Sequence, residues 1–145
     1  MILFRNRRDK YGFLSNFCLS PFEAEGLIWP TVEHFFQAMK TEDRQIQAVL
    51  AGLPTPLEAK KMGRQVQLRG DWAQVKYKVM LEALRQKFRQ NPDLAAKLLA
   101  TGDEELHEDS PHDKIWGWRD NGQDLLGKCL MRVRGELRRG TGPAI

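Results

Sequence analysis

The chain has 145 residues, of which 41% are hydrophobic and 29% charged; this composition suits one globular domain and excludes a disordered or fibrous protein. No apolar run is long enough to cross a bilayer, and residues 1–10 carry no signal-peptide pattern, so we expect a cytoplasmic protein with no membrane contact. The formal net charge of +4 suits an anionic partner such as a phosphate or a nucleic acid, but many of the arginines gather near the two ends of the chain.

The first half of the chain is predicted to form short elements. A helix begins near Val32, because the Thr31 hydroxyl can accept a hydrogen bond from an N–H group of the first turn. A second helical segment ends at Gly52, and a third begins with a capping box at Thr55 and ends at Gly63. The elements expected before these helices are strands at residues 1–4 and 22–29, the second interrupted at Gly26, and a turn-rich loop at residues 10–17.

Longer elements are predicted in the second half. Apolar residues recur at helical steps over residues 71–89, a further helix is closed by Gly102, and a final amphipathic helix ends at Gly140. Residues 104–124 lack a regular period, and a long loop of this kind in a compact domain is often functional. We therefore predict an α+β protein, a mainly helical single domain over residues 1–145 with a small β-sheet.

The helix that begins near Val32 carries the first group of reactive side chains. At about 100° per residue, Glu33, Gln37 and Lys40 fall on one stripe beside an apolar stripe. Glu33 and Lys40 are roughly 10 Å apart along the helix axis, so an acid and an amine could flank a small guest. Periodicity alone favours another interpretation, in which both charges are solvated and complement the helix dipole.

The loop over residues 106–117 holds the second group, made of acids, imidazoles and an aromatic ring. His107 and His112 lie among acidic residues, but they form no helical His pair and have no cysteine partner. Cys18 and Cys129 also lack the spacing of metal ligands, and we predict that they are free thiols. We therefore expect no metal site and no cofactor.

Five motifs are spread along nearly the whole chain: YGFLSNF at 11–17, WPTVEHFFQAMK at 29–40, MGR at 62–64, SPHDKIWG at 110–117 and LLGKCLM at 125–131. Together, in this order and spacing, they resemble the NADAR family, the group that includes the YbiA-like N-glycosidases. The resemblance implies hydrolysis of the N-glycosidic bond between a phosphorylated ribose and a base-like amine. Early ribosylaminouracil phosphates of the riboflavin pathway are substrates of this kind.

The resemblance and the chemistry of the bond give roles to three predicted catalytic residues. An N-glycosidase must protonate the leaving nitrogen and provide a group that takes up the anomeric carbon. Glu33, partly enclosed by Phe35 and Phe36, is expected to be the general acid and then the base. Lys40, its pKa lowered by burial, is expected to attack the ring-opened sugar and form a Schiff base. Asp113 is expected to orient a ribose hydroxyl or the water that releases the intermediate.

The predicted substrate-binding residues divide by the part of the substrate that they contact. Trp116 and Phe17 are expected to sandwich the base, and Asn16 and Gln37 to bind its polar edge. Arg5 and Arg64 are candidates for the phosphate, although packing in the scaffold is an equal alternative for both. The full predicted set is Arg5, Ser15, Asn16, Phe17, Gln37, Arg64, Trp116 and Gly117, the last because glycine lets backbone approach a ligand.

Three other functions stay open. The family resemblance also allows a hydrolase that removes ADP-ribose from guanine in nucleic acid or nucleotides. A non-catalytic ADP-ribose or nucleotide-binding module would not need both Glu33 and Lys40, and a basic nucleic-acid-binding module conflicts with the acidic stretch 103–109. Asp124 departs from the asparagine common in the family; its carboxylate could cap the last helix but would repel a phosphate, so we do not predict a ligand contact there.

Overall fold

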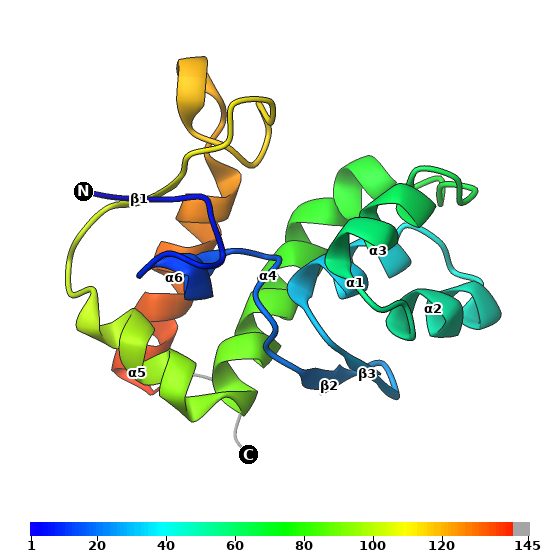
Figure 1. Ribbon diagram of the computed structural model, residues 1–145, viewed down its shortest axis with the longest axis horizontal. Helices are drawn as coiled ribbons and strands as arrows, with labels where there is room; N and C mark the ends of the chain where they lie inside the picture. Colours follow the sequence, from blue (N-terminus) through cyan, green and yellow to red (C-terminus); the bar gives the residue numbers. More distant parts are fainter. Residues whose placement is uncertain (141–145) are drawn as a thin grey trace. The chain divides into compact units, whose positions relative to one another are not determined.

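The computed structural model describes residues 1–140, which form two compact units that we treat separately. The central unit is Leu19–Gln90, and the terminal unit combines Met1–Cys18 with the segment that begins at Asn91. Each unit contains helices and one pair of short strands, so the chain is an α+β protein, as predicted (Figure 1). No helix within residues 1–140 has the length and apolar character needed to cross a membrane.

The central unit is built around a short buried helix, α1. All seven residues of α1 are buried, and the helix packs against α2, α3 and α4. The strands β2 and β3 pair in antiparallel fashion, and the predicted interruption at Gly26 is the turn between them, where Glu25 and Gly26 both have positive φ. The elements are β2 (Phe22–Ala24), β3 (Leu27–Trp29), α1 (Val32–Ala38), α2 (Arg44–Ala51), α3 (Pro56–Gly63) and α4 (Trp72–Gln90).

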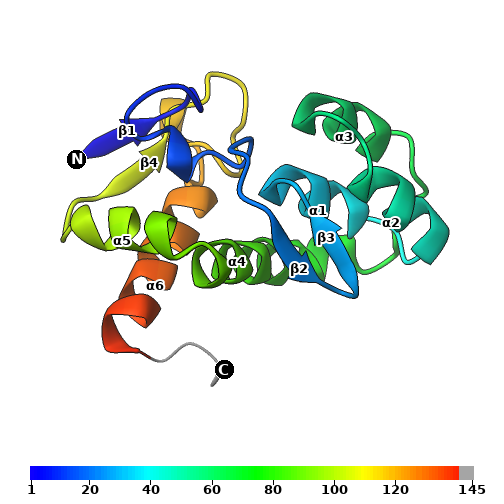
Figure 2. The same cartoon turned by 60° about the horizontal axis from the view of Figure 1, so that its bottom comes forward.

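The terminal unit joins the two ends of the described chain. Strand β1 pairs in parallel with β4, Ile2 opposite Leu106, and Figure 2 shows the two strands side by side with α6 below them. Helix α6 packs against β4 and α5. The elements are β1 (Ile2–Phe4), α5 (Pro92–Ala100), β4 (Leu106–Glu108), α6 (Leu125–Arg139) and two single 3-10 turns, Gly12–Leu14 and Arg119–Asn121.

Two predicted boundaries are wrong. Residues 104–124 are not one irregular loop, because β4 lies within them; its three residues are too few to show a period, and its partner is at the other end of the chain. The helix of the Glu33 motif ends at Ala38 and does not reach Lys40. In the turn after the helix, the Lys40 carbonyl accepts a hydrogen bond from the backbone N–H of Arg69 at 2.8 Å.

Candidate active site

The first turn of α1 is fixed by a reciprocal contact between Thr31 and His34. The Thr31 hydroxyl oxygen accepts from the His34 backbone N–H at 3.2 Å and lies 2.7 Å from its Nδ1. His34 Nε2 lies 2.9 Å from the Leu53 carbonyl, which can only accept, so Nε2 is the donor and Nδ1 accepts from Thr31. Burial lowers the pKa of His34, in keeping with a neutral ring. Residue 33 is therefore held in a rigid turn.

Glu33 is buried as predicted, with 8% of the residue exposed. Its Oε1 lies 3.5 Å from Nε2 of Gln37, one helical turn later. Phe35 is directed toward the β2–β3 hairpin, where its ring packs edge-on against Phe22 and Trp29.

Lys40 lies in the turn after α1, next to the ring of Phe36, whose centroid is 6.0 Å from Nζ. Burial lowers the pKa of Lys40; the Glu33 carboxylate opposes this effect, and Arg64 and Lys60 add to it. The direction agrees with the sequence prediction. The central unit thus places an amine that is easier to deprotonate within electrostatic reach of a buried acid and of the predicted phosphate ligand Arg64.

Gln37 and Gly63 mark the closest approach of α1 and α3. Gln37 is 5% exposed, and a Cβ added at Gly63 would lie only 2.8 Å from its Cδ and closer still to its Oε1. Residue 63 must therefore be glycine if the Gln37 amide is to keep this position. Because Arg64 follows directly, the same close approach sets the place of Arg64 beside Lys40.

The predicted residues near the N-terminus form a tight turn in the terminal unit. Ser15 follows the first 3-10 turn, and its hydroxyl accepts a hydrogen bond from the Phe17 backbone N–H at 3.1 Å. Asn16 and Phe17 are half-buried. Ser15 therefore shapes the backbone that carries Asn16 and Phe17, which is the role of a turn residue.

Asp113 organises the loop that carries Trp116. Its Oδ1 accepts from the backbone N–H groups of Ile115 at 3.0 Å and Trp116 at 2.9 Å. Gly117 packs against the Asp113 carbonyl, which leaves no room for a Cβ there. One Asp113 side-chain oxygen thus accepts hydrogen bonds from its own loop. The space left by the missing side chain of Gly117 is taken by the Asp113 carbonyl of the same loop. Trp116 is 9% exposed.

The start of α6 corrects the expectation for Asp124. Asp124 has a left-handed backbone, with a φ of 58°, and its side chain caps nothing. The N–H groups of Leu125 and Leu126 donate instead to the carbonyls of Ile115 and Trp116, both at 3.2 Å. The first turn of the helix is therefore satisfied by the loop.

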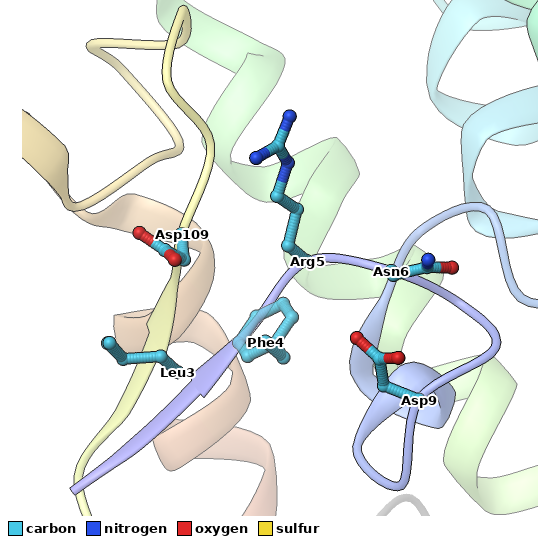
Figure 3. Close-up of a pocket in the computed structure, with 6 residues that line it drawn as sticks. All are labelled: Leu3, Phe4, Arg5, Asn6, Asp9 and Asp109. Atoms are coloured by element: carbon cyan, nitrogen blue, oxygen red, sulfur yellow. The ribbon is translucent and has the colours of Figure 1, made fainter.

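Arg5 lines a surface cavity of about 530 Å³ in the terminal unit (Figure 3). The side chain points away from the Phe4 ring and from the Asp9 carboxylate. Oδ1 of Asp109, which also lines the cavity, accepts a hydrogen bond from Nε of Arg119 at 2.6 Å. The cavity is also lined by the carboxylates of Asp9 and Asp109, whose negative charges would oppose a phosphate. The lining residues are Leu3, Phe4, Arg5, Asn6, Asp9 and Asp109, so Arg5 is the one predicted site residue among them.

A family model described as the NADAR domain matches residues 3–138 of the chain. This chain belongs to the NADAR family. It is 40% identical over 141 residues to N-glycosidase YbiA of Escherichia coli, with 94% of this chain and 88% of that protein covered. It is 43% identical over 135 residues to an N-glycosidase of Nostoc punctiforme, with 88% of this chain and 86% of that protein covered.

Two further matches are a longer riboflavin biosynthesis protein and a solved structure. A riboflavin biosynthesis protein of Vibrio vulnificus is 38% identical over 141 residues, which cover 94% of this chain and 38% of that longer protein. An NMR structure of Escherichia coli YbiA matches with a TM-score of 0.88 at 38% identity, covering 99% of this chain and 88% of that one. The α+β fold assigned to this NADAR chain is thereby confirmed.

The predicted site residues fall into two groups, one in each unit, and all of them except Arg5 lie in the NADAR motifs. Glu33, Gln37, Lys40 and Arg64 belong to the central unit, where Glu33 and Lys40 interact and Arg64 acts on Lys40. His34 and Lys60 were not predicted from the sequence as site residues. His34 could have been found from its place three residues after the Thr31 cap, and Lys60 from its place one helical turn before Arg64. The group in the terminal unit is Arg5, Ser15, Asn16, Phe17, Asp113, Trp116 and Gly117.

Proposed function

We propose that this chain is an N-glycosidase, a hydrolase that cleaves the bond between a phosphorylated ribose and a base-like amine. The observation that carries the proposal is the pairing of a buried acid, Glu33, with an amine, Lys40, whose pKa is lowered by burial. A group that donates a proton and a nucleophilic amine are the two components that such a cleavage needs. The relatives from Escherichia coli and Nostoc punctiforme are named N-glycosidases, which supports the same activity.

The proposed route uses Glu33 and Lys40 in turn. Glu33 protonates the ring oxygen of the ribose, the ring opens, and the nitrogen of the base becomes doubly bonded to C1′. Nζ of Lys40 adds to C1′, the bond from C1′ to the base nitrogen breaks, and that nitrogen leaves with a proton from the lysine. Water then adds to C1′ of the lysine imine and gives a proton to the Glu33 carboxylate; the bond from C1′ to Nζ breaks, which releases the phosphorylated ribose and restores both the amine and the Glu33 acid.

The phosphate is assigned to Arg64 rather than to Arg5. Arg64 and Lys60 both act on Lys40 as positive charges, so a dianionic phosphate beside them would be attracted. Arg5 shares its cavity with Asp9 and Asp109, whose negative charges oppose a phosphate. Asp113 remains proposed for the ribose or the water.

The proposed base contacts come from residues of the terminal unit. Phe17 and Trp116 are proposed to stack on the base, and Asn16 to bind its polar edge. Support comes from two backbone features: Ser15 fixes the turn that carries Phe17, and Asp113 fixes the backbone at Trp116. Rigid support of this kind is what a stacking side chain needs to be preorganised.

The substrate we propose is an early ribosylaminouracil phosphate, which the name of the Vibrio vulnificus relative supports. The test incubates the chain separately with that compound and with ADP-ribosylated guanosine, and measures the free base released by each. Release from the first compound is expected. Release from the second alone would make the chain an ADP-ribosyl-guanine hydrolase.

Two outcomes would contradict an enzymatic function altogether. Binding of either compound with no release would indicate a non-catalytic nucleotide-binding module. Salt-sensitive binding of nucleic acid with no hydrolysis would indicate a basic nucleic-acid-binding module, because each phosphate contact released by salt lowers the affinity.

A further inference from the structure

One side chain in the central unit connects Gly63 to Glu33. The amide nitrogen of Gln37 points toward the Glu33 carboxylate, with 3.5 Å between Nε2 and Oε1. The amide oxygen of Gln37 is buried against Gly63 and has no hydrogen-bond partner within residues 1–140. The Gln37 amide is therefore enclosed between a glycine on α3 and the proposed acid on α1.

The chemistry of the two neighbours fixes which way this amide faces. Oε1 of Glu33 can accept a hydrogen bond whether or not the other carboxyl oxygen carries a proton, so the nitrogen of Gln37 faces Glu33 and the oxygen faces Gly63. The Cα hydrogens of a glycine are weak donors that can sit against a carbonyl oxygen. A side chain at position 63 would take the space of that oxygen, because its Cβ would lie 2.8 Å from Cδ and 2.9 Å from Cβ of Gln37.

We propose that Gly63 is a positioning residue for proton transfer by Glu33: its missing side chain makes the space that holds the Gln37 amide with its nitrogen toward the carboxylate. This inference rests on the proposed N-glycosidase function. The separation of 3.5 Å is long for a hydrogen bond, which is common for catalytic contacts before substrate binds. The residue acts through Gln37 and does not itself contact the substrate.

The inference also changes the role of Gln37. The amide nitrogen faces Glu33 and the amide oxygen is buried against Gly63, so this inference assigns the amide to Glu33 in place of the polar edge of the base. Gly63→Ala and Gln37→Leu are therefore expected to lower kcat roughly 10- to 100-fold, the usual effect of misplacing a catalytic group, and to leave KM nearly unchanged. A rise in KM with kcat unchanged would return Gln37 to the base and overturn the inference.

A second measurement does not require any activity. An N–H donor stabilises an ionised carboxylate, so removing or turning it away makes the carboxylate hold its proton to higher pH. The titration of the Glu33 side-chain carboxyl is followed by 13C NMR in the wild type, Gly63→Ala and Gln37→Leu. The midpoint is expected to move to higher pH in both variants, and equal midpoints in all three chains would overturn the inference.

The two measurements separate this inference from the proposed function. A midpoint that moves in a chain that cleaves neither test compound would refute the N-glycosidase proposal and leave the positioning of Glu33 intact. If the wild type cleaves a test compound but Gly63→Ala and Gln37→Leu keep both the titration midpoint of Glu33 and kcat, the N-glycosidase proposal stands and the positioning of Glu33 by Gly63 is refuted. If Gly63→Ala does not fold, as judged by circular dichroism, Gln37→Leu carries the titration.

Two further chains serve as controls. Gly70→Ala is the matched glycine variant, because a Cβ at Gly70 would meet nothing within 4 Å, and it should behave as the wild type. The double variant Gly63→Ala with Gln37→Ala removes the crowded amide. In a chain that already carries Gln37→Ala, adding Gly63→Ala should cost little further activity. An equal cost in the wild type and in the Gln37→Ala chain would show that Gly63 does not act through Gln37.

Discussion

Nδ1 of His107 lies 2.6 Å from Oδ2 of Asp124, and this buried pair joins strand β4 to the residue that precedes α6. On its other side, His107 Nε2 lies 3.0 Å from a carboxylate oxygen of Glu105, and the ring stacks on Trp118. The loop that carries Trp116 leaves β4 and returns at Asp124. The His107–Asp124 contact therefore closes the base of that loop.

The first prediction compares two substitutions at Asp124. Asparagine adopts a positive φ readily and keeps a polar group for His107, so Asp124→Asn should lower the free energy of unfolding by about 1 kcal/mol or less. Alanine is strained in the left-handed region and leaves His107 without this partner, so Asp124→Ala should lower it by about 2–3 kcal/mol. Urea unfolding measures both. Equal losses would show that the pair contributes nothing specific.

The second prediction concerns Glu33→Gln. The substitution keeps the size of the side chain but cannot transfer a proton, so turnover should be abolished while the fold and most substrate binding remain. Release of free base in a single turnover, with circular dichroism as the check on folding, measures this. Near wild-type rates would remove Glu33 from the mechanism.

A structural feature could be predicted from the sequence when the residues that determine it are neighbours in the chain. The caps at Thr31 and Thr55 and the glycine stop at Gly140 are local, and the structure confirms all three. Strand β4 depends on a partner at the opposite end of the chain, and three residues carry no readable period. The backbone hydrogen bond to the Lys40 carbonyl in the turn after α1 comes from Arg69, which lies far beyond the helix in sequence.

In the candidate site, too, the features fixed by neighbouring residues could be predicted and those fixed by distant residues could not. Glu33 and Gln37 lie on adjacent turns of one helix, so their common face could be predicted from their spacing in the sequence. Lys40 was placed beside Glu33 by extending that helix; the helix stops earlier, yet the pKa of Lys40 still responds to Glu33. The use of Asp113 for backbone hydrogen bonds within its loop could not be predicted, because a carboxylate in a loop suits a ligand and a turn equally well.

The third prediction tests the imine route. If Lys40 attacks the opened sugar, borohydride added during turnover should reduce the imine to a stable adduct on Lys40. Mass spectrometry of the digested chain should then find the adduct on a single peptide. Direct displacement by water would leave nothing to trap.

A matched variant at Lys40 separates a nucleophile from a counter-ion. Lys40→Arg keeps a positive charge for the phosphate and removes an amine that can lose its proton near neutral pH. Activity should fall by several orders of magnitude and the adduct should disappear. Full turnover by this variant, together with no adduct in the wild type, would refute the imine.

The fourth prediction is a pH dependence of stability from His34. Its pKa is lowered by burial in the folded chain, so the folded state prefers the neutral ring. The stability that this ring contributes is full above its ordinary value of 6.5 and is lost as the pH falls below it. The Tm difference between wild type and His34→Gln, measured from pH 8 to 5, should shrink toward acid pH. A constant difference would contradict this account.

The pairing of β1 with β4 has a consequence for synthesis on the ribosome. The central unit is one continuous segment, Leu19–Gln90, so its elements can assemble once that segment has emerged. Strand β1 is made first but has to wait for Leu106–Glu108 before it gains its neighbour. Until Leu106–Glu108 has been made, a nascent chain exposes an unpaired edge strand, Ile2–Phe4, and that strand is where a chaperone or a second nascent chain would find hydrogen-bonding groups to pair with.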